Sequence, residues 1–193
     1  MAENIHPNFE RFVSREQKEA MLGQEGCVLW LYGMSGSGKS TIATEVEHQL
    51  SVQGRFTTVL DGDNLRSGLN ADLGFSDEAR HENVRRTAEV AKLFVSQGII
   101  TLISVITPLK AFRDLAREII GVDFKEIYVK ADYETCAHRD PKGLYAKVAE
   151  GKVANFTGKD SGFEEPSEAE LILDTNQLSP QQSAKRILAL LNF

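Results

Sequence analysis

Short apolar runs alternate with amphipathic segments along most of the chain. The apolar runs are rich in β-branched and aromatic residues and predict strands over residues 27–32, 56–60, 99–106, 126–129 and 171–173. The segments between and after them have helical spacing over about 39–53, 78–96, 109–120, 133–139 and 181–191. Strands that alternate with helices predict an α/β fold with a parallel sheet covered on both faces. Ligands of such folds bind beyond the carboxyl ends of the strands.

Two segments depart from this alternation. Ser14 is followed three residues later by Gln17, which is the spacing of a capping box, and Gly23 can end the short helix that follows. We therefore expect an N-terminal helical appendage over residues 1–23 and a single domain over residues 24–193. Residues 141–166 are rich in glycine, lysine and polar side chains without a steady period. Together with the residues just before them, they predict a mobile lid over about 139–166.

Composition and charge narrow the possible partners. The chain has 193 residues, and its 22 Lys and Arg against 28 Asp and Glu give a net charge of -6. No global positive field is therefore available to hold a nucleic acid. The apolar runs are far shorter than the roughly 18 residues that span a membrane. The N-terminus lacks the features of a secretory signal, and two cysteines make no disulfide framework, so we expect a cytoplasmic protein.

A glycine-rich motif lies between the first strand and the first helix of the predicted domain. Gly33-Met34-Ser35-Gly36-Ser37-Gly38-Lys39-Ser40 fits the pattern G-x-x-x-x-G-K-S/T, and Thr41 follows it. In such a loop, backbone N–H groups surround phosphates, the lysine reaches the outer phosphates, and the serine hydroxyl can ligate Mg²⁺. The pattern predicts an ATP site at residues 33–41, and the alternative is a plain glycine turn.

Two carboxylates follow the second predicted strand, at the same edge of the sheet. Asp61 and Asp63 suit a kinase, in which one carboxylate helps to hold hydrated Mg²⁺ and another accepts the proton of the attacking hydroxyl. A turn in which they cap the next helix is equally compatible with the pattern. The residues alone leave both interpretations open.

Further candidates lie on a helix and in the predicted lid. Arg80 and Asn83 stand near the start of the helix predicted at 78–96, where they can grip a phosphate or sulfate. Without context, such arginines more often lie on a solvated face. The basic segment 139–145, followed by Phe156, suits a lid over nucleotide phosphates, and its alternative is a surface loop with scattered lysines.

Several longer strings together resemble the adenylyl-sulfate kinase family over about residues 14–166. They are the phosphate loop, residues 60–70 (LDGDNLRSGLN), 72–76 (DLGFS), Arg80 with 82–86 (ENVRR), 139–145 and 156–158. The resemblance implies a P-loop kinase fold and a homodimer. It also implies transfer of the γ-phosphate of ATP to the 3′-hydroxyl of adenylyl sulfate, with Mg²⁺ as cofactor. A sulfate-adenylylating enzyme is left open as a partner.

The resemblance also implies roles for single residues. Asp63 would be the base, with Lys39 and Thr107 beside it in catalysis, and Asp61 and Ser40 would belong to the Mg²⁺ shell. Arg139 would cover the ATP. The acceptor nucleotide would be held by Arg66, Phe75, Arg80, Asn83, Ile106 and Phe156, with the two phenylalanines sandwiching its adenine.

Some positions depart from the family pattern, and all of them lie on the acceptor side. Thr107-Pro108-Leu109-Lys110 stands where the family commonly has Ser-Pro-Tyr-Arg, and Thr107 is the position at which the family can carry a phosphorylated serine. Leu109 lacks the phenol of that pattern and Lys110 lacks the bidentate fork of arginine, while Ala149 and Ala154 stand where the family commonly has Arg and Lys. We expect Lys110, Lys147 and Lys152 to compensate in part as point charges. Two alternatives therefore stay open: a kinase of the same fold for another nucleotide-linked acceptor, and a nucleotide-dependent switch or binding module.

Overall fold

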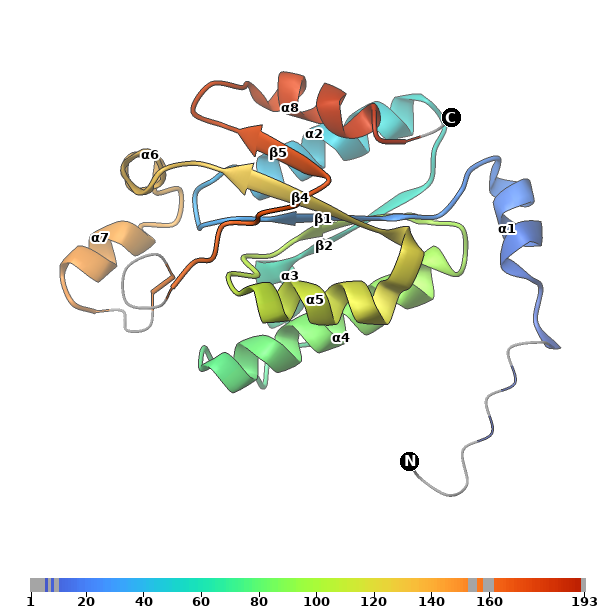
Figure 1. Ribbon diagram of the computed structural model, residues 1–193, viewed down its shortest axis with the longest axis horizontal. Helices are drawn as coiled ribbons and strands as arrows, with labels where there is room; N and C mark the ends of the chain where they lie inside the picture. Colours follow the sequence, from blue (N-terminus) through green and yellow to red (C-terminus); the bar gives the residue numbers. More distant parts are fainter. Residues whose placement is uncertain (1–5, 7, 9–10, 153–155, 158–161, 192–193) are drawn as a thin grey trace.

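The computed structural model describes residues 6, 8, 11–152, 156–157 and 162–191. Its strands are β1 (Val28–Tyr32), β2 (Thr57–Asp61), β3 (Ile100–Ser104), β4 (Phe124–Lys130) and β5 (Leu171–Asp174). All neighbours pair in parallel in the order β2-β3-β1-β4-β5, so β1 lies at the centre of the sheet (Figure 1). The predicted α/β fold with a parallel sheet is confirmed.

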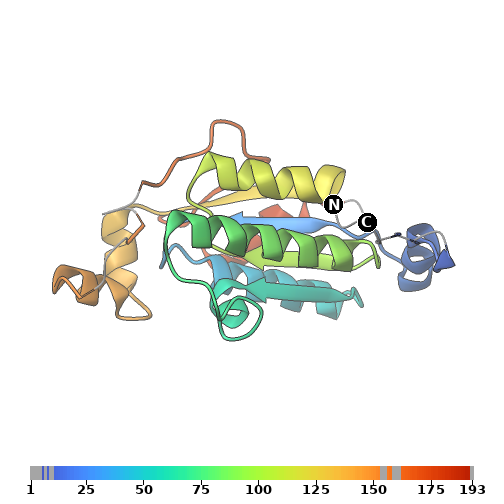
Figure 2. The ribbon, with the colours of Figure 1, turned by 90° about the horizontal axis from the view of Figure 1, so that it is seen from below.

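Helices cover both faces of the sheet. α2 (Lys39–Val52) and α8 (Pro180–Leu188) pack on one face, and α4 (Asp77–Val95) and α5 (Lys110–Ile120) pack on the other (Figures 1 and 2). A short 3₁₀ helix, η2 (Gly121–Asp123), joins α5 to β4. The short helices α3 (Gly62–Arg66), α6 (Tyr133–Arg139) and α7 (Leu144–Ala149) come after strand ends, whereas α1 (Arg15–Leu22) lies at the opposite end of the sheet (Figure 1).

The central strand shows why two layers of helices are needed. Its side chains alternate: Leu29 and Leu31 join the hydrophobic cluster of α2 and α8, and Trp30 and Tyr32 join that of α4 and α5. All of β1 is buried, as in parallel sheets that are covered on both faces. This rigid strand ends directly before the phosphate loop, so the loop is anchored in the core.

The observed elements differ from the predicted ones mainly at their ends. The strand predicted over 99–106 ends at Ser104, and the helix predicted over 181–191 ends at Leu188 in tighter turns. Two short helices, α3 and α7, lie where the sequence indicated a turn and a loop. An aspartate side chain accepts backbone N–H groups at the start of each: the N-cap Asp61 accepts that of Asp63, and Asp140, which precedes the N-cap Gly143 of α7, accepts those of Tyr145 and Ala146.

The N-terminal helix forms as predicted, between the Ser14 capping box and Gly23, whose φ is 63°. Arg15 ties it to the rest of the chain, because its guanidinium donates to both oxygens of Asp123 (2.6 and 2.8 Å) and to the carbonyl of Gly26 (2.9 Å). In the described part of the chain, no helix has the length and apolar character required to cross a membrane.

Candidate active site

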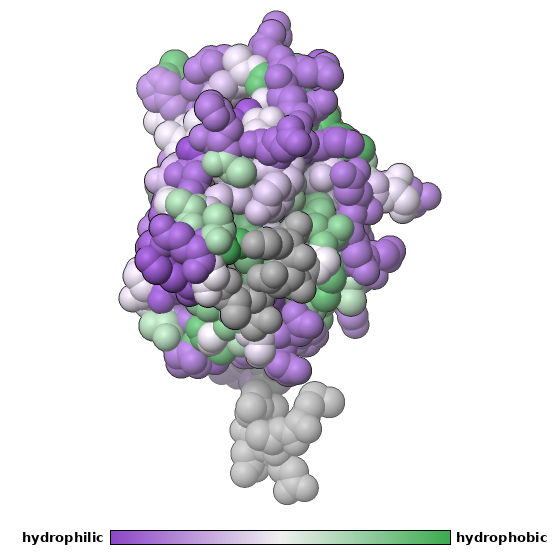
Figure 3. All heavy atoms as spheres, turned by 90° about the vertical axis from the view of Figure 1, so that its left-hand side faces the viewer, coloured by the Kyte–Doolittle hydropathy of each residue, from purple (hydrophilic) through white to green (hydrophobic). Residues whose placement is uncertain are grey.

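One large cavity opens at the carboxyl ends of the strands. Its volume is about 960 Å³, and its walls come from the loops that follow β1, β2 and β3 and from the predicted lid. Figure 3 looks onto this end of the molecule, where hydrophilic side chains predominate and hydrophobic ones lie in smaller patches among them. The position agrees with the rule that ligands of parallel α/β folds bind beyond the carboxyl strand ends.

Most of the residues predicted for the site line this cavity. Gly33 and Met34 do not, although the other residues of the phosphate loop do. The predicted residues in the wall are Ser35, Gly36, Ser37, Gly38, Lys39, Ser40, Thr41, Asp61, Asp63, Arg66, Phe75, Arg80, Asn83, Ile106, Thr107, Arg139 and Phe156. Residues separated by more than a hundred positions in the sequence thus meet in one pocket.

Close packing explains the glycines of the phosphate loop. A Cβ atom on Gly33 would lie 2.3 Å from the carbonyl oxygen of Val129, and one on Gly36 would lie 2.9 Å from that of Cys136. Gly36 also has a φ of 79°, which side chains disfavour. The loop therefore lies directly against β4 and α6.

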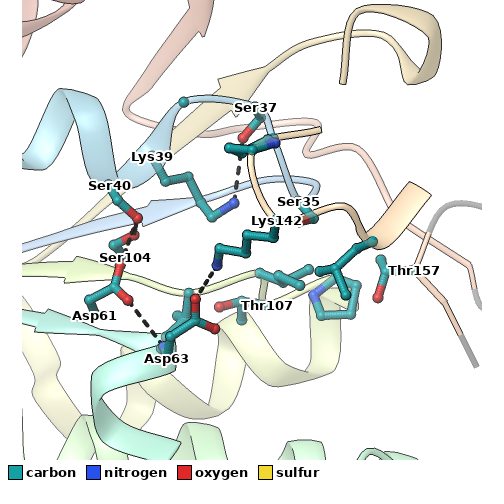
Figure 4. Close-up of a pocket in the computed structure, with 18 of the residues that line it drawn as sticks. Ser35, Ser37, Lys39, Ser40, Asp61, Asp63, Ser104, Thr107, Lys142 and Thr157 are labelled. Carbon is teal, nitrogen blue, oxygen red and sulfur yellow. Dashed lines mark hydrogen bonds and ion pairs between the residues drawn. The ribbon is translucent and has the colours of Figure 1, made fainter. Parts of the chain in front are cut away.

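Lys39 is buried at the base of this loop. Its ammonium group donates to the carbonyl oxygens of Gly33 (2.9 Å) and Met34 (2.7 Å), and it points into the space between the loop and Asp63 (Figure 4). Burial lowers the pKa of Lys39 to about 8. A phosphate group in the cavity would offer this ammonium the anionic partner that the carbonyls only partly replace.

Three oxygen-bearing side chains gather where β2 and β3 end. The Ser40 hydroxyl donates to Asp61 Oδ2 (2.6 Å) and lies 3.1 Å from the Ser104 hydroxyl (Figure 4). Burial acts to raise the pKa of Asp61, but the hydrogen bonds from Ser40, the Asp63 backbone and Ser104 outweigh it and keep this pKa below its usual range. Asp61 also caps α3. The two interpretations of this residue from the sequence, a helix cap and a ligand of Mg²⁺, are therefore compatible with each other.

Asp63 lies across the cavity from the phosphate loop. It forms an ion pair with Lys142, which precedes α7 in the predicted lid (Figure 4). The Asp63 carboxylate is mostly exposed to the cavity, so a bound hydroxyl can approach it. The lid segment is further joined to the phosphate loop by Tyr145, whose hydroxyl donates to the Ser35 carbonyl (2.8 Å).

The predicted acceptor residues occupy the other half of the cavity. Arg66 lies over the ring of Phe75 at 4.4 Å, and its guanidinium donates to the Leu73 and Gly74 carbonyls at 3.0 Å each. Arg80 donates to the Thr157 hydroxyl at 2.6 Å. Phe156 is buried and packs edge to face on Tyr145, with 4.8 Å between the ring centres.

The wall formed by Ile106 and Thr107 is tightly held. Thr107 has a φ of 40°, and its hydroxyl accepts the indole N–H of Trp30 at 3.0 Å. Arg113 donates to the carbonyls of Thr107 (3.3 Å) and Pro108 (3.2 Å), and its own charge is neutralised by Glu126, 3.1 Å away. These contacts hold Thr107 in a backbone conformation that is costly for a β-branched residue.

Arg139 reaches the phosphate loop from the end of α6. Its guanidinium donates to the hydroxyl (3.0 Å) and the carbonyl (2.7 Å) of Thr175. Thr175 follows β5 and donates its hydroxyl to the Ser37 carbonyl at 2.9 Å. Arg139 and Thr175 thus form the wall of the cavity on the side of β5.

The three lysines expected to compensate for missing basic residues do not line the cavity. Lys110 pairs with Asp114 (2.6 Å) and Lys152 with Glu150 (2.6 Å), and Lys147 lies on α7. The cavity wall therefore does not support this expectation, which used closeness in sequence without the direction of the side chains. Leu109 and Ala149 also lie outside the cavity wall, and Ala154 is not among the described residues.

Sequence reasoning missed Ser104, Lys142, Tyr145 and Thr175. Ser104 and Thr175 each stand at or just after a strand end, next to apolar runs that the sequence did identify. A systematic search for hydroxyls at the carboxyl ends of predicted strands would have found both. Lys142 and Tyr145 lie within the basic lid segment, but nothing in the sequence distinguishes them from their neighbours there.

Comparisons with known proteins agree with the motifs. A family model described as adenylylsulphate kinase matches residues 25–174. An adenylyl-sulfate kinase of Phocaeicola vulgatus is 52% identical over 97% of this chain and 93% of its own, and one of Clostridium kluyveri is 51% identical over 93% and 90%.

A solved structure of an APS kinase is also similar to this chain. It is described as the Mycobacterium tuberculosis APS kinase CysC in complex with AMPPNP and APS. It is 44% identical, with a TM-score of 0.84, and the match covers 86% of this chain and 98% of that one. The resemblance noted in the sequence is confirmed, and the chain belongs to the adenylylsulphate kinase family.

Proposed function

We propose that this chain transfers the γ-phosphate of ATP to the 3′-hydroxyl of adenylyl sulfate, giving 3′-phosphoadenylyl sulfate. Membership of the adenylylsulphate kinase family supports this activity, as does the relative described with AMPPNP and APS. The observation that carries the proposal is that a single cavity is lined by the phosphate loop and by Arg66, Phe75, Arg80 and Asn83. A switch that only hydrolyses ATP would not need this second group.

The ATP half of the cavity would hold the nucleotide by its phosphates. Backbone N–H groups of residues 35–41 would surround them at the N-terminus of α2, and Lys39 would turn from the Gly33 and Met34 carbonyls to the transferred phosphate. Arg139 and Thr175 would lie against the rest of the nucleotide. Lys142 would move with the lid between Asp63 and the phosphates.

The residues around Ser40 fit the Mg²⁺ that the family implies. Ser40, Asp61 and Ser104 offer hydroxyl and carboxylate oxygens, and Mg²⁺ is usually bound by one or two carboxylates together with substrate phosphates. Ser40 and Asp61 would therefore hold the ion, which when bound neutralises charge on the phosphates. The low pKa of Asp61 keeps its carboxylate ionised for this purpose at neutral pH.

The acceptor half would orient adenylyl sulfate toward Asp63. Phe75 and Phe156 would contact its adenine, while Arg66, Arg80 and Asn83 would face its anionic groups. The Asp63 carboxylate would then accept the proton of the 3′-hydroxyl as this oxygen attacks the γ-phosphate. Ile106 and Thr107 would form the fixed wall behind the acceptor, where the Trp30 N–H holds the Thr107 hydroxyl in place.

An acceptor panel tests the proposal. ADP release is measured with ATP, Mg²⁺ and, in turn, adenylyl sulfate, other adenine-linked acceptors and pyrimidine-linked acceptors. We expect turnover with adenylyl sulfate and little ADP release without an acceptor. Turnover with another acceptor but not with adenylyl sulfate would favour a different kinase of the same fold. ATP hydrolysis that is independent of every acceptor would favour a switch.

The proposal includes a homodimer in the cytoplasm, with residues 1–23 as an appendage to a kinase domain over 24–193. Assembly differs among similar proteins: an APS kinase from Thiobacillus denitrificans, 29% identical, is described as hexameric, and the match covers 28% of that chain. Light scattering on the purified protein tests the dimer, with a monomer or a hexamer as the contrary result.

A further inference from the structure

The carboxamide of Asn83, a residue of the cavity wall, is held at its oxygen end. It lies in the second turn of α4, whose first turns are at the cavity end of the sheet (Figure 2), and it is 7% exposed. Its Oδ1 accepts a hydrogen bond of 3.0 Å from Asn70 Nδ2. Since this bond fixes the oxygen beside Asn70, the NH₂ group is the end of the carboxamide that can donate to a ligand in the cavity.

Asn70 is fully buried in the turn between α3 and α4. Its backbone N–H donates to the Leu65 carbonyl (2.8 Å), and its carbonyl accepts the N–H of Leu73 (3.1 Å). Any residue could make these two backbone contacts. Among the described residues, the one hydrogen bond that needs an asparagine side chain here is the bond to Asn83.

An asparagine at position 70 is energetically unfavourable in one respect, which its hydrogen bond to Asn83 must offset. The Oδ1 atom of Asn70 is buried and has no hydrogen-bond partner among the described residues. A buried carbonyl without a donor is unfavourable, and a leucine has nearly the same shape without the unpaired atom. A leucine would, however, leave the buried Asn83 Oδ1 without its donor, so the amide at position 70 is explained by its bond to Asn83, a residue of the cavity wall.

We propose that Asn70 is a positioning residue that fixes the orientation of the Asn83 carboxamide. By occupying Oδ1, it makes Asn83 present N–H donors to the acceptor half of the cavity. The matching atom of adenylyl sulfate is then a hydrogen-bond acceptor, either a ring nitrogen of adenine or an oxygen of its anionic tail. A ligand that presents an N–H group at this place would face the N–H donors of Asn83, with no acceptor between them, and would bind poorly. The inference rests on the proposed function and assigns a specificity element to it.

The first test is Asn70→Leu. We expect the KM for adenylyl sulfate to rise about tenfold, the size of one lost hydrogen bond, because the Asn83 carboxamide is free to turn. The KM for ATP should stay within about twofold, and the melting temperature should change by only a few degrees, because the unpaired Asn70 carbonyl is removed while Asn83 Oδ1 loses its donor. Asn64→Leu is the matched control: Asn64 is exposed, lies outside the cavity wall and should leave all three values unchanged.

The deciding measurement is a double-mutant cycle with Asn83→Ala. If Asn70 acts through Asn83, Asn70→Leu raises the acceptor KM in the wild-type background and has no further effect when Asn83 is already alanine. An equal rise in both backgrounds would overturn the inference, as would a parallel rise in the KM for ATP. If the leucine variant does not fold, Asn70→Ser gives the same cycle, with the same two results deciding it.

The wild-type protein separates this inference from the proposed function. Suppose that the wild-type protein phosphorylates adenylyl sulfate but the effects of Asn70→Leu and Asn83→Ala on the acceptor KM simply add. This result would reject the role of Asn70 and leave the kinase assignment standing. If the wild-type protein did not use adenylyl sulfate at all, the proposed function would fail, and with it the acceptor that Asn83 is said to face.

Discussion

The two halves of the cavity differ in the groups that line them. The phosphate half consists of backbone anchored by β1, with glycines packed against β4 and α6 and with Lys39 buried beneath the loop. The acceptor half consists of side chains from the turn after α3, from α4 and from the predicted lid. Phe75 illustrates the contrast: it is 63% exposed, and Arg66 covers one face of its ring.

This difference indicates how the two substrates are bound. The phosphate half is already shaped for its ligand, because its glycines and buried groups leave little freedom to rearrange. The acceptor half depends on contacts between distant segments, such as that of Arg80 with Thr157. We therefore expect changes in the first half to affect chemistry and changes in the second half to affect acceptor affinity.

The largest expected effect is the loss of Lys39. Lys39→Ala should lower kcat by about 10³-fold or more, because it removes the cation at the transferring phosphate. The melting temperature should hardly change, since a buried ammonium with a lowered pKa contributes little to folding. Lys92→Ala, on the exposed side of α4, is the control that should retain full activity. A well-folded Lys39→Ala protein with near-normal turnover would contradict the phosphate-loop assignment.

Asp63→Asn comes next. The amide keeps the size of the side chain but cannot accept the proton, so kcat should fall by about 10² to 10⁴ while the KM values change little. Steady-state kinetics give both values, and Asp114→Asn on the surface of α5 is the matched control. If kcat stays within a few fold of the wild type, Asp63 serves only as part of the α3 cap.

Phe75→Ala should affect the acceptor alone. Stacking of a base on an aromatic ring contributes about 1 to 3 kcal/mol, so affinity for adenylyl sulfate should fall between about fivefold and 150-fold. Calorimetry with an ATP analogue should show unchanged nucleotide affinity. Leu93→Ala removes another exposed apolar side chain, far along α4, and should change neither value. Equal losses for both ligands would remove the distinction between the halves.

The smallest expected effect is a pH dependence of ATP binding. The pKa of Lys39 is lowered to about 8 by burial, and a bound phosphate raises it again. Below pH 8 the ammonium is already charged, so affinity should be constant there. Above pH 8 binding must take up a proton, and affinity should fall by as much as about tenfold per pH unit. In Lys39→Arg this decline should disappear, because arginine stays charged.

The sequence predicted the phosphate half better than the acceptor half for a physical reason. A strand, a glycine loop and a helix are neighbours in the chain, so their geometry follows from local rules, and residues 33–41 identify it. The acceptor residues come from separate segments and meet only after folding, as Arg66, Phe75, Arg80 and Phe156 do. The resemblance to a known family was needed to assign them to one site. The strand order has no local signal either.

Errors in the prediction have the same origin. Lys110 was expected to compensate near the acceptor because it stands where the family commonly has arginine, but its side chain pairs with Asp114 on α5. Helix α7 was missed because its N-cap is Gly143, and the side chain that accepts its first N–H groups, Asp140, lies three residues before that glycine. Asn70 belonged to a string that resembles the family, yet its contact with Asn83 requires the packing of α4.

A crystal structure of this chain with a nonhydrolysable ATP analogue and adenylyl sulfate tests the central claim most directly. We expect the γ-phosphate beside Lys39 and the 3′-oxygen of adenylyl sulfate between it and Asp63. That oxygen should lie within about 3.2 Å of the carboxylate and roughly 3 to 3.5 Å from the phosphorus. An acceptor bound in the other half of the cavity with its 3′-oxygen turned away from Asp63 would contradict the account.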